Sequence, residues 1–340
     1  MPVTHRLELD LRPATLDDAR IVANLEATLD QEDPRDPEML RFWWTKRSPN
    51  EVFKRLLSVR QGEAVAFVAA GHEWWEAAAG RFGWIRPILR ADIWSEPAYS
   101  HLVSTAEAWL RSETAAVAVA RVREDRRNEL DILDRLGYRE VRRQNFSELD
   151  LVANRKELLA GATHQRQRMQ AQGVQLLTVS DDNDPDLMAK LHEMMVAAEQ
   201  DIPTTVPIRP APFDEWKRVT FENPATRKDR FWIARESTAI VGLSALDFPP
   251  TRGLPWTSFT ATSKEVRGRG IARALKYESI AQAIGLGYKR VRTANDGANA
   301  PILHLNQEMG YRLVVPVIEL HRDLEQPGAR NQGQRALNLP

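Results

Sequence analysis

A short basic turn punctuated by two glycines carries the residues best suited to chemistry in this sequence. It comprises Arg267, Gly268, Arg269, Gly270, Ile271 and Ala272. A glycine lets the backbone approach a bound group without a Cβ in the way, and the free N–H groups at a helix N-terminus attract anions. The two arginines add positive charge beside those donors. The pattern therefore predicts a cradle for a pyrophosphate group.

The segments on either side of this turn determine how it is held. Trp256–Thr262 is rich in β-branched and aromatic residues, which favours a strand. After the turn, Ile271, Leu275, Ile280 and Ile284 form an imperfect helical stripe. A strand, a turn and a helix in this order place several backbone N–H groups at the start of the helix, where its dipole favours an anion.

Two other phosphate-binding motifs fit this turn less well. A dinucleotide-binding fold needs Gly-x-Gly-x-x-Gly and an acidic residue about 20 residues later. Gly285 comes too late in the chain to serve as the third glycine. A P-loop needs Gly-Lys followed by Ser or Thr, which is missing here. The turn therefore favours a phosphate ligand of another kind.

The second half of the chain repeats the first. Leu130–Arg139 and Leu303–Arg312 both read as a helix closed by a glycine, Gly137 or Gly310, and followed by a strand. At the position of the cradle the first half has Ile85–Trp94, which contains a proline and no Gly-x-Gly. The repeat predicts two similar domains, of which only the second keeps the cradle.

Changes in composition predict the limits of these domains. Residues 1–153 would form a degenerate first domain and residues 174–325 the second, which carries the glycine turn. The polar, basic segment 154–173 reads as a connecting helix. Its charges fit a solvated linker better than a nucleic-acid-binding helix, which is the alternative they leave open. Residues 326–340 read as a flexible tail.

The overall composition argues against several classes of protein. The chain has 340 residues with 47 basic and 47 acidic side chains, so its zero net charge disfavours nucleic-acid binding through a basic surface. It has no run of about 18 apolar residues that could span a membrane. Lacking a signal-peptide pattern and cysteine as well, it is expected to be cytoplasmic, without a membrane partner. Because His192, His304 and His321 are isolated, no metal site is predicted.

The cradle and the last predicted helix together resemble the GNAT family of N-acetyltransferases. Arg267–Ala272 fits the acyl-CoA signature of that family, Arg/Gln-x-x-Gly-x-Gly/Ala. Thr293–Asn295, Asn299–Asn306 and Met309–Tyr311 are similar to its later motifs. The resemblance is strong over residues 175–325 and rests on the internal repeat over residues 7–151. The layout is similar to that of tandem members such as the mycothiol synthases.

The resemblance implies an α/β fold of the α+β kind, with two tandem GNAT-like domains, each a mixed, mostly antiparallel sheet flanked by helices. It implies acetyl-CoA as cosubstrate, with its pyrophosphate on the amides of residues 268–272. In this family the strand before the signature separates from its neighbour at a bulge. The backbone of Thr260, Ala261 and Thr262 would then pair with the pantetheine arm and polarise the thioester. Asn299 would lie beside the same arm.

The resemblance also implies that an amine attacks the thioester directly, without a covalent enzyme intermediate. Many members have a tyrosine as general acid on the last helix, where this sequence has Asn306, which cannot supply a proton at neutral pH. Water or Tyr311 would take that role, although Tyr311 is expected to pack because it follows a helix-ending glycine. Glu199 and Asp201 are candidate general bases, with Asp247 as a further candidate.

The sequence thus predicts an N-acetyltransferase with its active site in the second domain. Its acceptor would be a small-molecule or peptide amine, and the protein would be a monomer or a homodimer. One alternative is a non-catalytic acyl-CoA-binding or scaffold protein, which the asparagine at position 306 favours. Another is an aminoacyl transferase on the same doubled fold that takes charged tRNA. The neutral net charge and the CoA signature argue against it.

Overall fold

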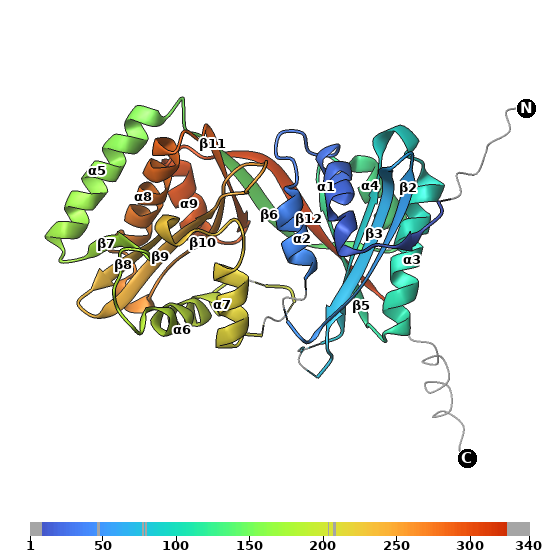
Figure 1. Cartoon of the computed structure of the whole chain (residues 1–340), viewed down its shortest axis with the longest axis horizontal. Helices are drawn as coiled ribbons and strands as arrows, with labels where there is room; N and C mark the ends of the chain where they lie inside the picture. Colours follow the sequence, from blue (N-terminus) through green and yellow to red (C-terminus); the bar gives the residue numbers. More distant parts are fainter. Residues whose placement is uncertain are drawn as a thin grey trace, which may run out of the picture.

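The computed structural model describes residues 9–45, 48–76, 78, 80–202, 204–206 and 209–324. The N-terminal half lies on the right of Figure 1 and the C-terminal half on the left. The strands are β1 (Arg12–Pro13), β2 (Glu51–Arg60), β3 (Glu63–Glu73), β4 (Phe82–Leu89), β5 (Val117–Arg123), β6 (Arg139–Asp150), β7 (Gln175–Thr178), β8 (Phe231–Glu236), β9 (Ala239–Asp247), β10 (Trp256–Thr262), β11 (Arg290–Asp296) and β12 (Arg312–Asp323). The helices are α1 (Ala19–Ala27), α2 (Pro37–Trp44), α3 (Glu96–Ser112), α4 (Arg127–Arg135), α5 (Arg155–Ala171), α6 (Leu187–Glu199), α7 (Phe213–Phe221), α8 (Ile271–Gly285) and α9 (Ala300–Glu308).

Strand β3, in the N-terminal half, shows how helices cover both faces of the sheet. Residues 64–70 are a continuous apolar run, a pattern that predicts a strand buried on both faces. In the structure, Phe67 and Ala69 pack with α1 and α2, whereas Ala66 and Val68 pack with α3. Since successive side chains point to opposite faces of a sheet, an unbroken apolar run can satisfy both layers.

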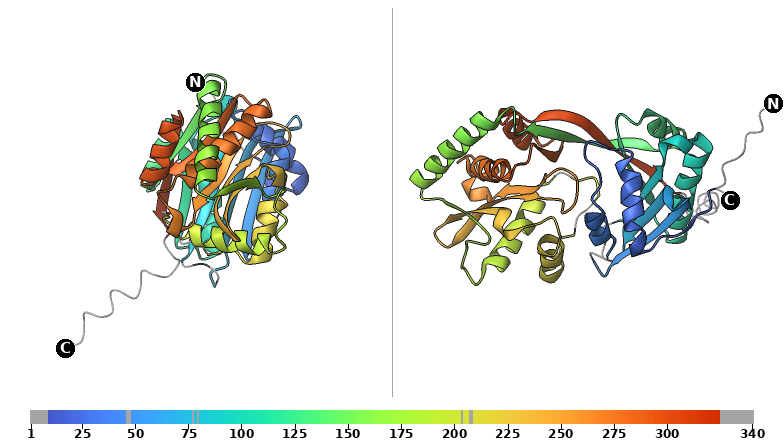
Figure 2. Two further views of the ribbon diagram at one scale, coloured as in Figure 1. Left: turned by 90° about the vertical axis from the view of Figure 1, so that its left-hand side faces the viewer. Right: turned by 45° about the horizontal axis from the view of Figure 1, so that its top comes forward.

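The described strands form one twelve-stranded sheet, because each half donates its last strand to the other. The order is β1-β2-β3-β4-β5-β12-β6-β11-β10-β9-β8-β7. β12 pairs with β5 of the N-terminal half along Val317–Asp323, and β6 pairs with β11 of the C-terminal half along Gln144–Asp150. The two exchanged strands also pair with each other. Figure 2 shows them crossing between the halves.

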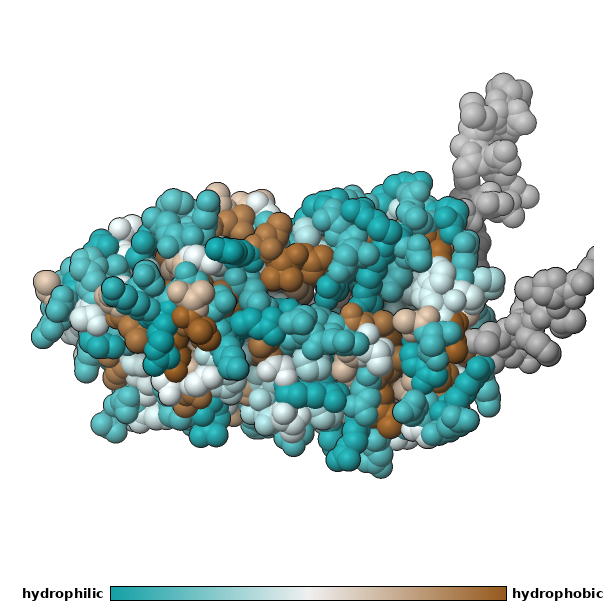
Figure 3. All heavy atoms as spheres, turned by 90° about the horizontal axis from the view of Figure 1, so that it is seen from above, coloured by the Kyte–Doolittle hydropathy of each residue, from teal (hydrophilic) through white to brown (hydrophobic). Residues whose placement is uncertain are grey.

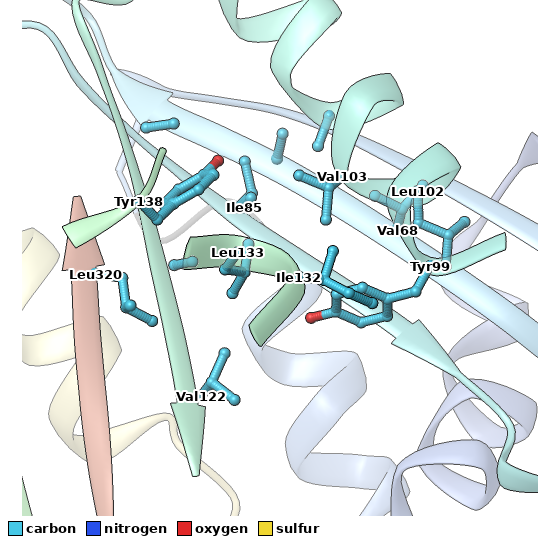
Figure 4. Close-up of a cluster of buried hydrophobic side chains, with 14 of the residues drawn as sticks. Val68, Ile85, Tyr99, Leu102, Val103, Val122, Ile132, Leu133, Tyr138 and Leu320 are labelled. Carbon is cyan, nitrogen blue, oxygen red and sulfur yellow. The ribbon is translucent and has the colours of Figure 1, made fainter. Parts of the chain in front are cut away.

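The hydrophobic cores follow this exchange. Leu320 of β12 packs in the core of the N-terminal half, close to Leu133 and Tyr138 (Figure 4). Leu149 of β6 packs in the core of the C-terminal half with Ile280 of α8. The limits 1–153 and 174–325 therefore describe the repeat in the sequence, whereas each folded half contains one strand from the other repeat.

The predicted connecting helix is present as α5, and it packs against α8. Leu158 and Met169 are buried, and a Cβ on Gly161 would lie only 2.3 Å from the Tyr277 ring. Arg166 forms an ion pair with Glu278 at 2.6 Å. One face of α5 is thus a packed layer of the C-terminal half rather than a solvated linker.

Several elements differ from what the sequence pattern predicts. The first strand, β1, begins at Arg12, and residues 1–8 lie outside the described residues. α2, β2 and α7 have no clear signal in the sequence. In β2 the alternation is obscured by Arg55, whose guanidinium lies over the rings of Trp44 and Phe53. The tail predicted at 326–340 also lies outside the described residues.

The surface over the junction of the two halves is partly apolar. Seen from above, hydrophobic side chains gather near the middle of the molecule (Figure 3). Leu313 and Val314, at the start of β12, are exposed hydrophobic residues. Among the described residues, no helix combines the length and the apolar composition that a membrane span requires.

Candidate functional site

The glycine turn has the backbone geometry that an anion cradle requires. Gly268 and Gly270 have φ angles of +80° and +89°, in the left-handed region that favours glycine. Gly270 is the N-cap of α8, and its carbonyl accepts the N–H of Ala274 at 3.0 Å. The first N–H groups of a helix have no partner within the helix, so those of α8 are directed toward the turn. The turn expected from the sequence is therefore present.

The two arginines of the turn are both paired with carboxylates. Arg267 forms an ion pair with Asp201, which also contacts Lys264 at 3.0 Å. Arg269 binds Glu236 through two hydrogen bonds of 2.9 and 3.0 Å. These partners offset much of the positive charge that the sequence led us to assign to the cradle. They hold the side chains of the turn in place.

A third arginine reaches the cradle from α5. A Cβ on Gly270 would lie 3.0 Å from the guanidinium of Arg168, which makes no hydrogen bond or ion pair with another described residue. Gln172, just after α5, accepts from Arg269 Nε and donates to the Arg269 carbonyl, each at 3.3 Å. The sequence marks this segment as basic, but only the packing of α5 on α8 shows that Arg168 is the unpaired cation at the turn.

The strand that leads into the turn separates from its neighbour. β10 and β11 are parallel and pair only at Trp256–Arg292 and Thr257–Thr293. The pairing of β10 with β9 shifts register between Thr257 and Phe259, which marks a bulge. From Phe259 to Thr262, β10 pairs with β9 alone. The backbone of Thr260, Ala261 and Thr262 on the β11 side therefore faces an opening.

The two asparagines named from the sequence lie at opposite ends of α9. Asn299 is the N-cap of α9 and is half-buried. Asn306 is buried at 3% exposure, and its Nδ2 donates to Asn295 Oδ1 on β11 at 2.7 Å. Asn295 lies two residues after Thr293, the last position of β11 that pairs with β10. Asn306 is thus on the helical side of the same opening.

The three candidate carboxylates have different environments. Asp201 is held by Arg267 and Lys264, whose hydrogen bonds lower the pKa of Asp201. Glu199, at the end of α6, has a pKa raised by burial and lies near His192. Burial also raises the pKa of Asp247, at the end of β9, although it accepts from Thr226 Oγ1 at 2.9 Å. Only Asp201 is in direct contact with the turn.

Asp247 also lines a cavity of about 710 Å³ between the two halves. Trp256 and Phe146 lie on its C-terminal side, in edge-to-face contact with 5.1 Å between ring centroids. On its N-terminal side the cavity reaches Trp43 and the end of β4, where β4 stops pairing with β5 after Ile85. Of the adjacent residues Trp43 and Trp44, Trp43 lines the cavity, whereas Trp44 packs in the core of the N-terminal half.

The first half opens its sheet in a similar way but has no cradle. Its α3 begins after Ser95 with a proline in the first turn, where α8 begins after Gly270. Among the described residues, no three His, Cys, Asp or Glu side chains are grouped so that they could hold a metal ion. Of the isolated histidines, His304 is largely exposed beside Glu308 on α9.

Part of the C-terminal half matches a known protein family. Residues 192–311 match the model of the Acetyltransferase (GNAT) family, a range that includes the glycine turn, the separated strands and α9. No curated protein matches the chain.

Solved structures match nearly the whole chain. A tandem GNAT protein from the clavulanic acid biosynthesis pathway is 15% identical, with 94% of this chain and 100% of that chain covered at a TM-score of 0.73. A GCN5-related N-acetyltransferase from Sphaerobacter thermophilus is 19% identical, with coverages of 94% and 96% and a TM-score of 0.64. FemX is 12% identical, with coverages of 93% and 98% and a TM-score of 0.58. At these identities the likeness is one of fold, and it confirms the predicted tandem architecture.

Proposed function

We propose that this chain is a tandem GNAT acyltransferase whose C-terminal half transfers an acetyl group from acetyl-CoA to an amine, as the family match over residues 192–311 and the tandem fold suggest. The observation that carries the proposal is the separation of β10 from β11 directly before the glycine turn. A phosphate cradle and an extended slot with free backbone groups suit a ligand with a pyrophosphate at one end and an amide-bearing arm at the other.

In this proposal the pyrophosphate binds the amides of Gly268 to Ala272, and Arg168 supplies the unpaired positive charge. The pantetheine arm pairs with the backbone of Thr260, Ala261 and Thr262 and passes Asn299. The thioester then lies near the bulge at Ser258, where backbone N–H groups stabilise the charge that develops on its carbonyl oxygen.

We propose Asp247 rather than Glu199 or Asp201 as the base that receives a proton from the amine. Burial raises its pKa and so makes it a stronger base, whereas the ion pairs of Asp201 lower the pKa of that carboxylate and keep it a weaker base. It lines the cavity between the halves and accepts a hydrogen bond from Thr226. The position of Asp247 in the cavity wall distinguishes it from Glu199 on α6.

The acceptor, a small-molecule or peptide amine, would reach the bulge from this interdomain cavity. Aromatic and charged side chains line the cavity together, which suits a ligand with both apolar and polar parts. The N-terminal half then contributes substrate-binding walls instead of a second CoA site. We expect a cytoplasmic protein, either a monomer or a homodimer.

A non-catalytic acyl-CoA-binding protein is the second candidate, because Asn306 stands where a proton donor is expected. It predicts CoA binding without release of free thiol on addition of amines. The aminoacyl transferase alternative predicts instead that charged tRNA, and not acetyl-CoA, is the donor. A screen of amines with acetyl-CoA that measures free thiol separates these three activities.

Calorimetric titration with acetyl-CoA tests the location of the site. We expect one site per chain, and Arg168→Gln should weaken binding about tenfold because it removes a charged phosphate contact. Arg166→Gln is the matched control on the same helix, since Arg166 is paired with Glu278. It should lower stability and leave CoA affinity unchanged. Two equivalent sites, or equal effects of both variants, would contradict the proposal.

A further inference from the structure

Three buried polar atoms near the proposed acyl-CoA site have no hydrogen-bond partner among the described residues. They are Lys276 Nζ, Asn306 Oδ1 and the Tyr311 hydroxyl, and their residues are 1%, 3% and 7% exposed. The Lys276 ammonium group lies 5.0 Å from the centre of the Tyr311 ring. The backbone N–H of Tyr311 in turn donates to the Asn306 carbonyl at 3.0 Å. Lys276 of α8 and Tyr311 are thus in contact, and Asn306 is joined to Tyr311 through the backbone at the end of α9.

These three residues are directed toward the point where β10 and β11 separate. On α8, Lys276 lies one turn after Ala272 and one turn before Ile280, and both of those residues pack in the core that contains Tyr311. The Tyr311 hydroxyl lies beside Thr257, the last residue of β10 that pairs with β11. Asn306 binds Asn295, beyond that last pair. Lys276 is thus on the slot-facing side of the helix that begins at the cradle.

Packing alone does not account for a lysine at this position. Burial of the amine lowers the pKa of Lys276 to about 7, and no nearby charge offsets that burial. The carboxylate of Glu278 on α8 binds Arg166 of α5, and Glu308 on α9 binds Arg273. Tyr311, whose own pKa burial raises, is the titratable neighbour. A buried amine without a partner costs stability, so an apolar side chain would fit this core better.

We propose that Lys276 is the proton donor for the coenzyme A thiolate that leaves during acyl transfer. The inference rests on the proposed function. It assigns to Lys276 the role of general acid, which the amide of Asn306 cannot fill. The acceptor nitrogen forms a bond to the thioester carbon, and the C–S bond breaks with its electron pair on sulfur. The sulfur takes a proton from the Lys276 ammonium group. The surplus proton on nitrogen goes to Asp247, and water recharges Lys276 after the thiol has left.

Asn306 and Tyr311 have positioning roles in this step. The Asn306 side chain is held by Asn295, and its Oδ1, which has no partner among the described residues, is an acceptor still available to a donor. The face of the Tyr311 ring favours the charged form of Lys276 over the neutral form. Together they allow a cation to persist in a site that otherwise disfavours one.

Lys276→Met is the direct test, because methionine has a similar length and no proton to give. We expect kcat for thiol release from acetyl-CoA, with any amine that the wild type accepts, to fall at least about a hundredfold. The Kd for CoA should stay within about twofold, since the cradle is unchanged. Thermal stability should rise because the buried amine is removed. Ile280→Met, one turn further along the same stripe, controls for repacking and should keep its activity.

The pH profile distinguishes a proton donor from a packing residue. In the wild type, kcat should fall as pH rises through about 7, where Lys276 loses its proton. Lys276→Met should lack this decline at every pH at which it turns over. A wild type without the decline, or a Lys276→Met variant that keeps its rate or keeps the decline, would overturn the inference even if the variant folds poorly. Wild-type protein that binds acetyl-CoA but releases no thiol with any amine would overturn the proposed function itself.

Discussion

Gly270 is the residue on which the cradle depends most directly. Its φ of +89° is strained for any other residue, and a Cβ there would lie 3.0 Å from the Arg168 guanidinium. We expect Gly270→Ala to weaken CoA binding about tenfold or more. Gly287→Ala is the matched control, since Gly287 has a similar φ of +86° after the other end of α8 and nothing within 4 Å. Calorimetry should find unchanged CoA affinity in the control, and equal losses would mean that backbone strain alone is responsible.

Substitution of Asp247 is expected to raise stability and to lower activity. The pKa of Asp247 is raised in the folded protein, so the folded state favours the protonated carboxyl group. The stability that this protonated group contributes is lost as pH rises through the pKa of the folded state. Asp247→Asn should therefore be more stable than the wild type at pH 7, and the difference should shrink as pH falls toward about 4. Transfer should fall at least about a hundredfold. Thermal melts across pH and thiol-release assays check both; full activity would remove Asp247 as the base.

The sequence predicts the turn at residues 267–272 well, because the spacing of its two glycines is a local pattern that depends on no distant residue. It does not predict how the charges are distributed. Arg267 and Arg269 look free in the sequence, and their partners Asp201 and Glu236 come from other elements. Arg168 lies on α5, far before Gly270 in the sequence, and only tertiary packing brings the two together.

At the scale of elements, α5 supports the cradle through its close packing on α8. A Cβ on Gly161 would lie 2.3 Å from Tyr277, so Gly161→Ala should destabilise the protein by about 1–3 kcal/mol and move Arg168 away from the turn. Gly285→Ala, with nothing within 4 Å, is the control and should be neutral or stabilising. Urea unfolding measures both.

A second substitution tests whether the Tyr277 ring causes the destabilisation expected of Gly161→Ala. If the Tyr277 ring is the obstacle, Tyr277→Leu should cost less stability in the Gly161→Ala background than in the wild type. Additive effects would show that the two residues do not interact. CoA affinity should recover with stability in the double variant, because α5 can then return toward α8.

The pattern-based prediction of elements succeeds where one type of side chain dominates. The apolar run of β3 is visible in the sequence because both faces of that strand are buried. The amphipathic spacing of α4 is visible because only one face of that helix is buried. β2 is missed because Lys54 and Arg55 interrupt its apolar residues, and Arg55 is accommodated only by rings from two elements. The sequence does not predict that α5 packs against the C-terminal half, because its charged side chains look solvated. In the structure one of them, Arg166, is paired with Glu278 of α8.

At the scale of the whole molecule, the exchange of β6 and β12 predicts that neither half is stable alone. Residues 9–153 should be largely unfolded by circular dichroism, since β5 would lack its neighbour β12. Coexpression with residues 154–324 should give a folded complex with one copy of each piece. Two pieces that fold separately and do not associate would contradict the exchanged sheet.

A cut in the intact chain provides the control for that experiment. Val152 lies in an exposed turn between β6 and α5, so a protease site there should be cleavable in the native protein. The two products should then run as one particle until denaturant is added, because β6 and β12 still pair with both halves. Separation under native conditions would show that the covalent connection, and not the sheet, holds the halves together.

The sheet order has a consequence for how the chain is made on the ribosome. Arg121 of β5 and Glu319 of β12, which form an ion pair at 2.7 Å, are separated by 198 positions. The edge of β5 therefore stays uncovered during synthesis until residues 312–323 have left the exit tunnel. Such distant pairings slow folding and leave partly folded chains prone to association. Of the two repeats, the one translated first cannot complete its sheet before the one translated last.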